Sequence, residues 1–106
     1  EIEQDMARIV NAESVGVLAA VCREQGARFI HISTDYVFNG NSARPYTESD
    51  DTAPLNAYGV TKRAGELEAL SQNPDSVIVR TSWVYSVFGK KIFRAEKGLS
   101  RFCRVR

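Results

Sequence analysis

The stretch GARFIHIST, residues 26–34, decides the fold of this chain. Its aromatic and β-branched residues predict a strand over residues 28–34, and Gly26 predicts the end of a preceding helix. Apolar side chains recur at spacings of three and four over residues 5–25, which is typical of an amphipathic helix. The predicted buried stripe of this helix comprises Val10, Ser14, Val15, Leu18, Ala19 and Cys22.

The residues after this strand predict a second helix and a second strand. A long loop over residues 36–57 is rich in turn-forming residues and leads into a helix over residues 57–72. The buried stripe predicted for this helix is Ala57, Val60, Ala64, Leu67 and Leu70. Residues 76–82 are rich in Val and Ile, as in a strand of a parallel sheet. The order helix-strand-helix-strand predicts the α/β class, as a partial Rossmann-like, doubly wound parallel sheet.

The amino-acid composition and charge limit the classes of protein to which this chain can belong. The chain has 106 residues, 43% of them hydrophobic and 25% charged, which predicts one soluble globular domain. Residues 1–89 carry seven basic and twelve acidic side chains, whereas residues 90–106 carry seven basic and one acidic. We interpret this basic tail as a solvated terminus and expect neither a nucleic-acid nor a membrane partner. Two distant cysteines predict reduced thiols and a cytoplasmic protein.

A Tyr-x-x-x-Lys pair, Tyr58 and Lys62, lies in the second predicted helix. A spacing of four residues places both side chains on one helix face, about one turn apart. A phenol is a poor acid at neutral pH, and a nearby ammonium group makes it a usable proton donor or acceptor. Such pairs also occur by chance on surface helices, so the motif alone leaves both interpretations open.

Polar side chains follow both predicted strands. Ser33, Thr34 and Asp35 close the first strand, and Trp83 follows the second. In open α/β sheets ligands bind at the carboxyl ends of the strands, where a hydroxyl group can donate to a substrate oxygen and a Trp can stack on a ring. The alternative is that the hydroxyl groups satisfy turn backbone groups and that Trp83 packs in the protein.

Several blocks of sequence resemble one family in the same order and with similar spacing. The blocks are STDYVFNG (33–40), PYTESD (45–50), APLNAYGVTK (53–62), GE (65–66) and RTSWVY (80–85). They resemble the dTDP-4-dehydrorhamnose reductases, which belong to the extended short-chain dehydrogenases/reductases. The resemblance runs from about residue 8 to Gly89.

This resemblance implies a fold and a reaction. The family has a Rossmann domain that binds NADPH (NADH in some members) and a smaller substrate domain, and it reduces the 4-keto group of dTDP-4-dehydro-L-rhamnose, a nucleotide sugar used for cell-surface polysaccharide. By resemblance, Tyr58 gives a proton to the C4 oxygen, Lys62 holds the cofactor ribose, and Thr34 hydrogen-bonds the keto oxygen. Asp35 and Trp83 would contact substrate. No metal ligands are implied, and a homodimer is possible for a full-length form.

The sequence departs from the family pattern in two places. It has no Gly-x-x-Gly-x-x-Gly, and after Gly89 it loses the family pattern and becomes basic. We therefore predict a central segment of a reductase, with residues 1–89 as part of an NAD(P)-binding Rossmann domain that lacks its Gly-rich half and residues 90–106 as a divergent basic tail. Two strands leave sheet edges unpaired, so we expect the isolated chain to be inactive and marginally stable.

A non-enzymatic alternative is a regulatory homologue. The β subunit of methionine adenosyltransferase keeps this reductase-like fold without catalysing reduction. Its strand-end block usually reads Ser-Ser-Asp, and it lacks the Trp-Val-Tyr block. Thr34 and Trp83 therefore favour the enzyme.

Overall fold

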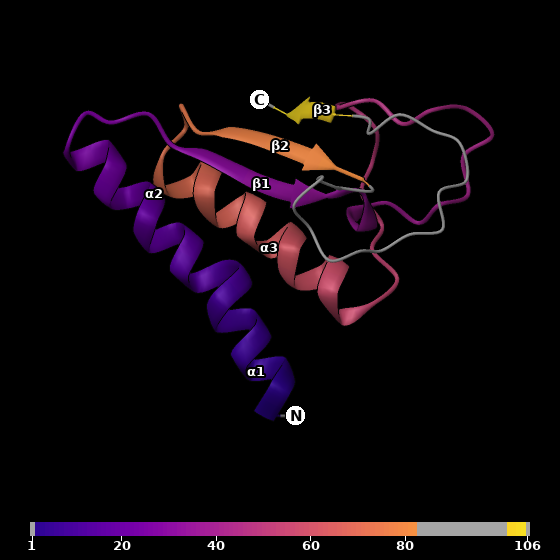
Figure 1. Cartoon of the computed structure of the whole chain (residues 1–106), viewed down its shortest axis with the longest axis horizontal. Helices are drawn as coiled ribbons and strands as arrows, with labels where there is room; N and C mark the ends of the chain where they lie inside the picture. Colours follow the sequence, from indigo (N-terminus) through magenta and orange to yellow (C-terminus); the bar gives the residue numbers. More distant parts are fainter. Residues whose placement is uncertain (1, 83–101, 106) are drawn as a thin grey trace, which may run out of the picture.

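The fold was described from a computed structural model, which defines residues 2–82 and 102–105. Three successive helical segments, α1 (Ile2–Arg8), the π-helical η1 (Ile9–Glu13) and α2 (Ser14–Glu24), form the first helical arm (Figure 1). The strand β1 (Ile30–Thr34) follows, and then the short 3-10 helix η2 (Asp35–Val37). The chain continues through α3 (Ala57–Gln72), β2 (Val77–Thr81) and β3 (Phe102–Val105). The predicted helix-strand-helix-strand order is confirmed.

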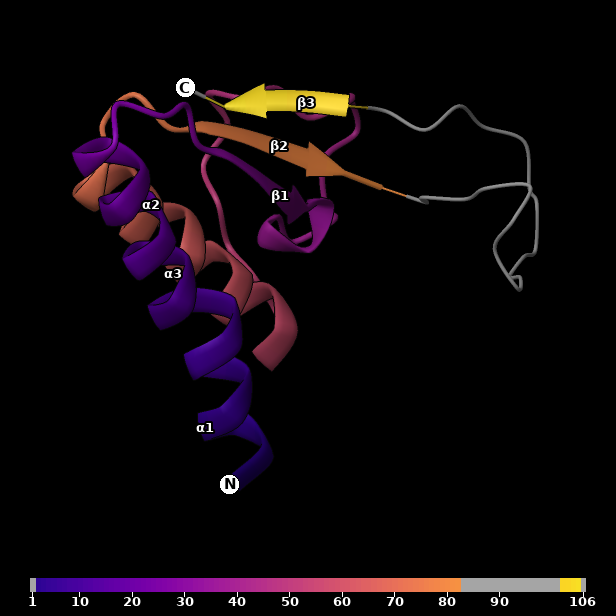
Figure 2. The ribbon, with the colours of Figure 1, turned by 60° about the vertical axis from the view of Figure 1, so that its left-hand side comes forward.

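The sheet is built on two parallel strands. β1 pairs with β2 in the register that runs from Ile30 opposite Val77 to Thr34 opposite Thr81. Helices α2 and α3 pack against each other and lie on the same side of this sheet (Figures 1 and 2). This α/β architecture confirms the predicted fold class. It also brings the carboxyl ends of both strands to one edge, where residues from β1, β2 and α3 can meet.

The tail contains an element that the sequence analysis did not predict. β3 pairs antiparallel with β2, so that the sheet has the order β1-β2-β3 and is mixed rather than purely parallel. A free strand edge presents unpaired N–H and C=O groups, and a short apolar segment satisfies them by adding a strand. The sequence analysis had assigned no strand to residues 102–105.

The predicted buried stripe of the first helix was only partly right. Val15 is buried, but Val10 and Leu18 are 58% and 56% exposed. Ala19 is buried as predicted, and the other buried positions, Ala12 and Gly16, are small residues outside the predicted stripe. Small residues allow two helices to approach closely along a narrow strip, and a narrow strip leaves the larger apolar side chains at its margins uncovered.

The stripe predicted for α3 was also displaced. Ala57, Val60 and Leu67 are exposed, and the buried face consists of Gly59, Thr61, Gly65, Glu66 and Ala69. A Cβ atom at Gly65 would collide with the carbonyl oxygen of Asn11, so this glycine permits the close contact between α3 and η1. Asn11 also donates a hydrogen bond from Nδ2 to Thr61 Oγ1 at 3.1 Å. Periodicity of apolar residues missed this face because its members are small or polar.

A buried ion pair joins α3 to β2. Glu66 is completely buried and Arg80 is 2% exposed. Arg80 donates from Nε to Glu66 Oε1 at 2.8 Å and from Nη2 to Oε2 at 2.7 Å. Arg63, one turn earlier in α3, donates from Nη1 to the same Oε2 at 2.7 Å. Burial raises the pKa of Glu66, but the hydrogen bonds from Arg80 and Arg63 outweigh burial, so the net pKa lies below the ordinary 4.5.

This pKa shift predicts that acid destabilises the fold. The folded state binds the Glu66 proton more weakly than the unfolded state, so its contribution is complete above about pH 4.5 and is lost as pH falls through the folded pKa. The double variant Glu66→Leu with Arg80→Met removes the titrating carboxylate together with its buried partner, and only the partly exposed Arg63 loses its carboxylate. We expect urea unfolding followed by circular dichroism to show a flatter pH dependence for the double variant below pH 4.5. Parallel pH profiles for the two proteins would contradict this assignment.

The ends of the helices match their predicted signals. Gly26, just beyond α2, has a φ of 66°, a left-handed conformation that glycine adopts without strain. Asn56 caps α3, because its Oδ1 accepts a hydrogen bond from the Gly59 N–H at 2.7 Å. In the part of the chain that the structure describes, no helix is long and apolar enough to cross a membrane.

Candidate functional site

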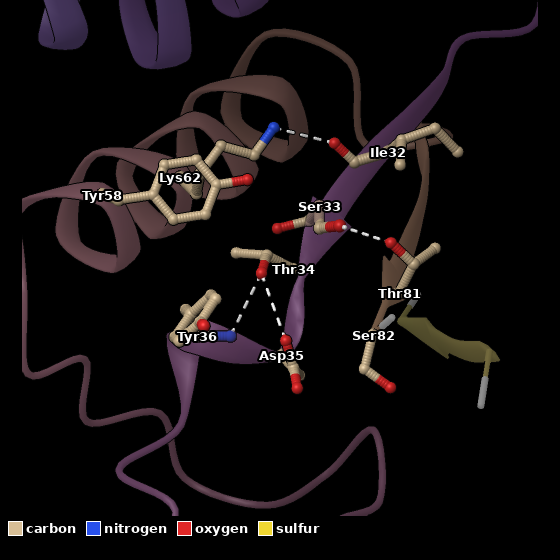
Figure 3. A pocket seen from close by; sticks show the side chains of 9 residues that line it. All are labelled: Ile32, Ser33, Thr34, Asp35, Tyr36, Tyr58, Lys62, Thr81 and Ser82. Atoms are coloured by element: carbon tan, nitrogen blue, oxygen red, sulfur yellow. Dashed lines mark hydrogen bonds between the residues drawn. The ribbon is translucent and has the colours of Figure 1, made fainter. Parts of the chain in front are cut away.

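A pocket of about 340 Å³ opens at the carboxyl ends of β1 and β2, beside the start of α3 (Figure 3). Four of the predicted site residues, Thr34, Asp35, Tyr58 and Lys62, line it together. Its remaining lining residues are Ile32, Ser33, Tyr36, Thr81 and Ser82. The structure therefore brings together residues that lie up to 50 positions apart in the sequence, as expected for a site at this edge of a parallel sheet.

The Tyr-x-x-x-Lys pair projects from α3 toward β1 (Figure 3). Lys62 is partly buried, and its Nζ donates a hydrogen bond to the Ile32 carbonyl oxygen at 2.8 Å. Burial lowers the pKa of Lys62, while the nearby carboxylate of Glu66 acts in the opposite direction. Tyr58 is 48% exposed, so its phenol is accessible from the pocket. The ammonium is thus anchored to the strand, and the phenol one turn away stays open to a ligand.

The hydroxyl group of Thr34 is held at the floor of the pocket. Its Oγ1 accepts a hydrogen bond from the Tyr36 N–H at 3.2 Å and donates to Asp35 Oδ1 at 3.3 Å. The backbone N–H fixes the position of the oxygen, whereas the donated bond to a neighbouring carboxylate is long. A ligand oxygen that entered the pocket would compete with Asp35 for the hydroxyl proton.

Three further lining residues were not among the predicted site residues. The ring of Tyr36 packs edge-on against the ring of Tyr58, with centroids 5.9 Å apart. Thr81 donates from Oγ1 to the Ser33 carbonyl oxygen at 3.3 Å, and Ser82 follows it at the mouth of the pocket. The sequence carried a signal for Thr81 and Ser82, because they close the second strand as Ser33 and Thr34 close the first. Trp83, the remaining predicted substrate contact, lies outside the described residues.

Comparison with protein families matches residues 1–97 to the model of the RmlD substrate binding domain. The chain belongs to this family. The match is wider than the predicted resemblance, which ran from about residue 8 to Gly89. Nothing in these comparisons tests the predicted division of the chain at Gly89.

Two curated relatives of this chain are named as sugar-nucleotide reductases. A dTDP-4-keto-6-deoxy-D-glucose reductase from Streptomyces niveus is 50% identical over 95 residues, which cover 89% of this chain and 33% of the relative. A dTDP-4-dehydrorhamnose reductase from Escherichia coli is 45% identical over 101 residues, which cover 95% of this chain and 34% of the relative. The chain therefore spans about a third of the length of the curated relatives that it matches.

Solved structures of the family share the fold. A dTDP-4-dehydrorhamnose reductase from Clostridium acetobutylicum superposes with a TM-score of 0.79 at 43% identity, over 84% of this chain and 32% of that protein. The Bacillus anthracis enzyme, solved in complex with NADP, also superposes with a TM-score of 0.79. It is 40% identical, and the match covers 85% of this chain and 32% of that protein. The Rossmann-like character predicted from the sequence is confirmed by these neighbours.

One glycine permits the close approach of α3 to η2 beside the pocket. A Cβ atom at Gly59 would collide with the carbonyl oxygen of Tyr36, so α3 can approach η2 this closely only with glycine at position 59. This contact lies next to Tyr58 in the chain. It holds the phenol over the segment that carries Thr34 and Asp35.

Proposed function

We propose that this chain supplies the catalytic residues of an NADPH-dependent reductase that converts dTDP-4-dehydro-L-rhamnose to dTDP-L-rhamnose. The observation that carries the proposal is the convergence of Tyr58, Lys62 and Thr34 on one pocket at the carboxyl ends of two parallel strands. Support also comes from relatives named as reductases of this class. NADH remains possible as the cofactor.

The residues of this chain are suited to bind one part of the cofactor, a ribose. Lys62 and Tyr58 offer an ammonium and a hydroxyl group within one pocket, which suits the hydroxyl groups of a ribose. NADPH, when bound, supplies the hydride. Backbone amides of a glycine-rich turn, the usual cradle for a pyrophosphate, are not among the residues of this sequence. Lys62 and Tyr58 would therefore hold only the ribose next to the nicotinamide.

The roles of the chain's own residues follow from their geometry. The Thr34 hydroxyl turns from Asp35 to the keto oxygen and donates a hydrogen bond to it. The Tyr58 phenol transfers its proton to the same oxygen as negative charge develops there, and Lys62 stabilises the resulting phenolate. Asp35 would then be free to accept a hydrogen bond from a sugar hydroxyl group. Trp83 is proposed as a further substrate contact.

The test is a chimaera in which the aligned residues of this chain replace those of the Escherichia coli reductase. We expect substrate-dependent oxidation of NADPH by the purified chimaera. A chimaera that folds and binds NADPH but leaves the substrate unchanged would contradict the proposal.

A second candidate substrate is dTDP-4-keto-6-deoxy-D-glucose, because the Streptomyces niveus relative that is named for this sugar shares 50% identity with the chain. Both candidate sugars carry a 4-keto group and a dTDP group that the reduction leaves in place, so the same pocket chemistry applies. Turnover of each sugar by the chimaera, compared as kcat/KM, separates the two candidates.

The regulatory alternative gains no support from the relatives reported above, which are named as reductases. A regulator would bind its partner equally well with phenylalanine at position 58. Cytoplasmic location and a homodimeric full-length form stay predictions.

Thr34 provides a prediction with a conservative control. Thr34→Val keeps the side-chain shape but removes the hydroxyl group, so it should lower the kcat/KM of the chimaera by about 10- to 200-fold, the range of one hydrogen bond to a developing charge. Thr34→Ser retains the hydroxyl group and should stay within about threefold of the parent. Steady-state kinetics measures both variants. A loss in Thr34→Ser as large as the loss in Thr34→Val would contradict a specific role of the hydroxyl group.

A further inference from the structure

The buried Glu66–Arg80 pair is formed by residues close in sequence to the pocket-lining Lys62 and Thr81. Tyr58, Lys62 and Glu66 are spaced by four residues along α3, so they follow one another on the same helix face. On β2, Arg80 immediately precedes Thr81, which lines the pocket. The pair thus joins α3, which bears Tyr58 and Lys62, to the end of β2, which supplies Thr81 to the pocket.

Arg80 also contacts the segment that follows η2. Its guanidinium carbon lies 5.0 Å from the centre of the Phe38 ring, and Phe38 stacks on Tyr46 at 4.2 Å between centroids. Phe38 follows the 3-10 turn that carries Asp35 and Tyr36. One planar guanidinium therefore contacts α3, through Glu66, and the residue that follows η2, Phe38; α3 and η2 are two of the segments that supply side chains to the pocket.

Stability alone is a poor explanation for this arrangement. Removing two charges from water is costly, and apolar side chains of similar volume often stabilise a fold as well or better. Arg80 carries a further cost, because its Nη1 is buried and has no hydrogen-bond partner among the described residues. The bidentate geometry, in contrast, fixes both distance and orientation between the joined elements, which an apolar contact does not do.

We infer that Glu66 and Arg80 are positioning residues for the reductase reaction, which hold Tyr58 and Lys62 in register with Thr34 and Asp35. Neither touches the substrate. They act through the segments that they join. This inference rests on the proposed function. Misplacement of reacting groups by about 1 Å can cost about 100-fold in rate, so a loosened pair should lower kcat more than it raises KM.

The deciding variant is Glu66→Leu combined with Arg80→Met in the chimaera. Glu66→Leu alone leaves the buried Arg80 unpaired, and Arg80→Met alone leaves the buried Glu66 with only the partly exposed Arg63, so both single variants are expected to be strongly destabilised. We expect the double variant to melt at or above the parental temperature, with kcat lowered at least tenfold and KM within about threefold. Arg63→Met is the matched control: it also removes a cation from Glu66, but Arg63 belongs to α3 itself and joins no second element. Its kcat should stay within about twofold of the parent.

A spectroscopic readout is independent of turnover. Incorporation of 3-fluorotyrosine, with Tyr58→Phe to assign the resonance, reports the surroundings of the Tyr58 ring by fluorine NMR. We expect this resonance to shift or broaden in the double variant and to be unchanged in Arg63→Met. A double variant with parental kcat, or with an unchanged Tyr58 resonance, would overturn the inference. Absence of turnover in the parental chimaera would instead contradict the proposed function, and the NMR comparison would still decide the positioning role.

Discussion

Replacing Tyr58 by phenylalanine is expected to lower the kcat of the chimaera by about 10²–10⁴-fold, the range typical of a lost general acid. The variant keeps the ring, so its edge-on contact with Tyr36 and the packing of α3 are preserved. Only the hydroxyl group that would transfer the proton is removed. NADPH affinity, measured by fluorescence titration, should fall far less than kcat, because the ribose loses the Tyr58 hydroxyl group but keeps Lys62, which remains bonded to Ile32.

Tyr46→Phe is the matched control for this experiment. The Tyr46 hydroxyl group accepts from the Ser42 N–H at 3.1 Å and donates to Asn39 Oδ1 at 3.0 Å, within the loop and away from the pocket. The stack on Phe38 is retained in this variant. We expect parental kcat for Tyr46→Phe. A Tyr58→Phe variant within tenfold of the parent would show that another group donates the proton.

Gly65→Ala is expected to be the most destabilising of the small substitutions in the helices. The new methyl group would meet the Asn11 backbone, which cannot rotate away, so α3 and η1 must separate. Overpacking of this kind typically costs about 1–3 kcal/mol, and backbone collisions lie at the upper end. The measurement is urea unfolding of the chain followed by circular dichroism.

Gly16→Ala is the control in α2, because the nearest atom to a new methyl group there belongs to a side chain and not to the backbone. The nearest atom to a Cβ at this position is Glu68 Oε2, at 3.1 Å, on a flexible side chain. Alanine favours a helix over glycine by about 0.5–1 kcal/mol, so Gly16→Ala should be neutral or slightly stabilising. Equal destabilisation by both substitutions would contradict a special close approach at Gly65.

The elements of the fold could be predicted because their signals are local. Gly26 and Asn56 mark helix ends through their own backbone and side-chain chemistry, and the aliphatic residues of β1 and β2 favour strands wherever they occur. The buried faces were harder to predict, since Thr61, Gly65 and Glu66 carry no apolar signal. Their burial depends on the neighbouring helix and on Arg80, which lies on a different strand.

The candidate site could likewise be predicted only in part. Thr34, Asp35, Tyr58 and Lys62 could be predicted, because strand ends and a helix motif place them at one edge of a parallel sheet. Tyr36 was missed because nothing in the sequence indicates that the turn after β1 directs its ring toward Tyr58. The link between Glu66 and Arg80 was missed for a related reason: helix spacing shows which residues share a face, but it does not show which strand residue lies opposite.

The central claim is that this pocket directs hydride to the C4 carbon of a nucleotide sugar while Tyr58 protonates the oxygen. The most direct measurement uses the chimaera, dTDP-4-dehydro-L-rhamnose and NADPH carrying deuterium at its transferable position, with product analysis by NMR. We predict dTDP-L-rhamnose with deuterium at C4, and no such product with Tyr58→Phe on the same time scale. Oxidation of NADPH without deuterium at C4, or equal product formation by the Tyr58→Phe variant, would contradict the claim.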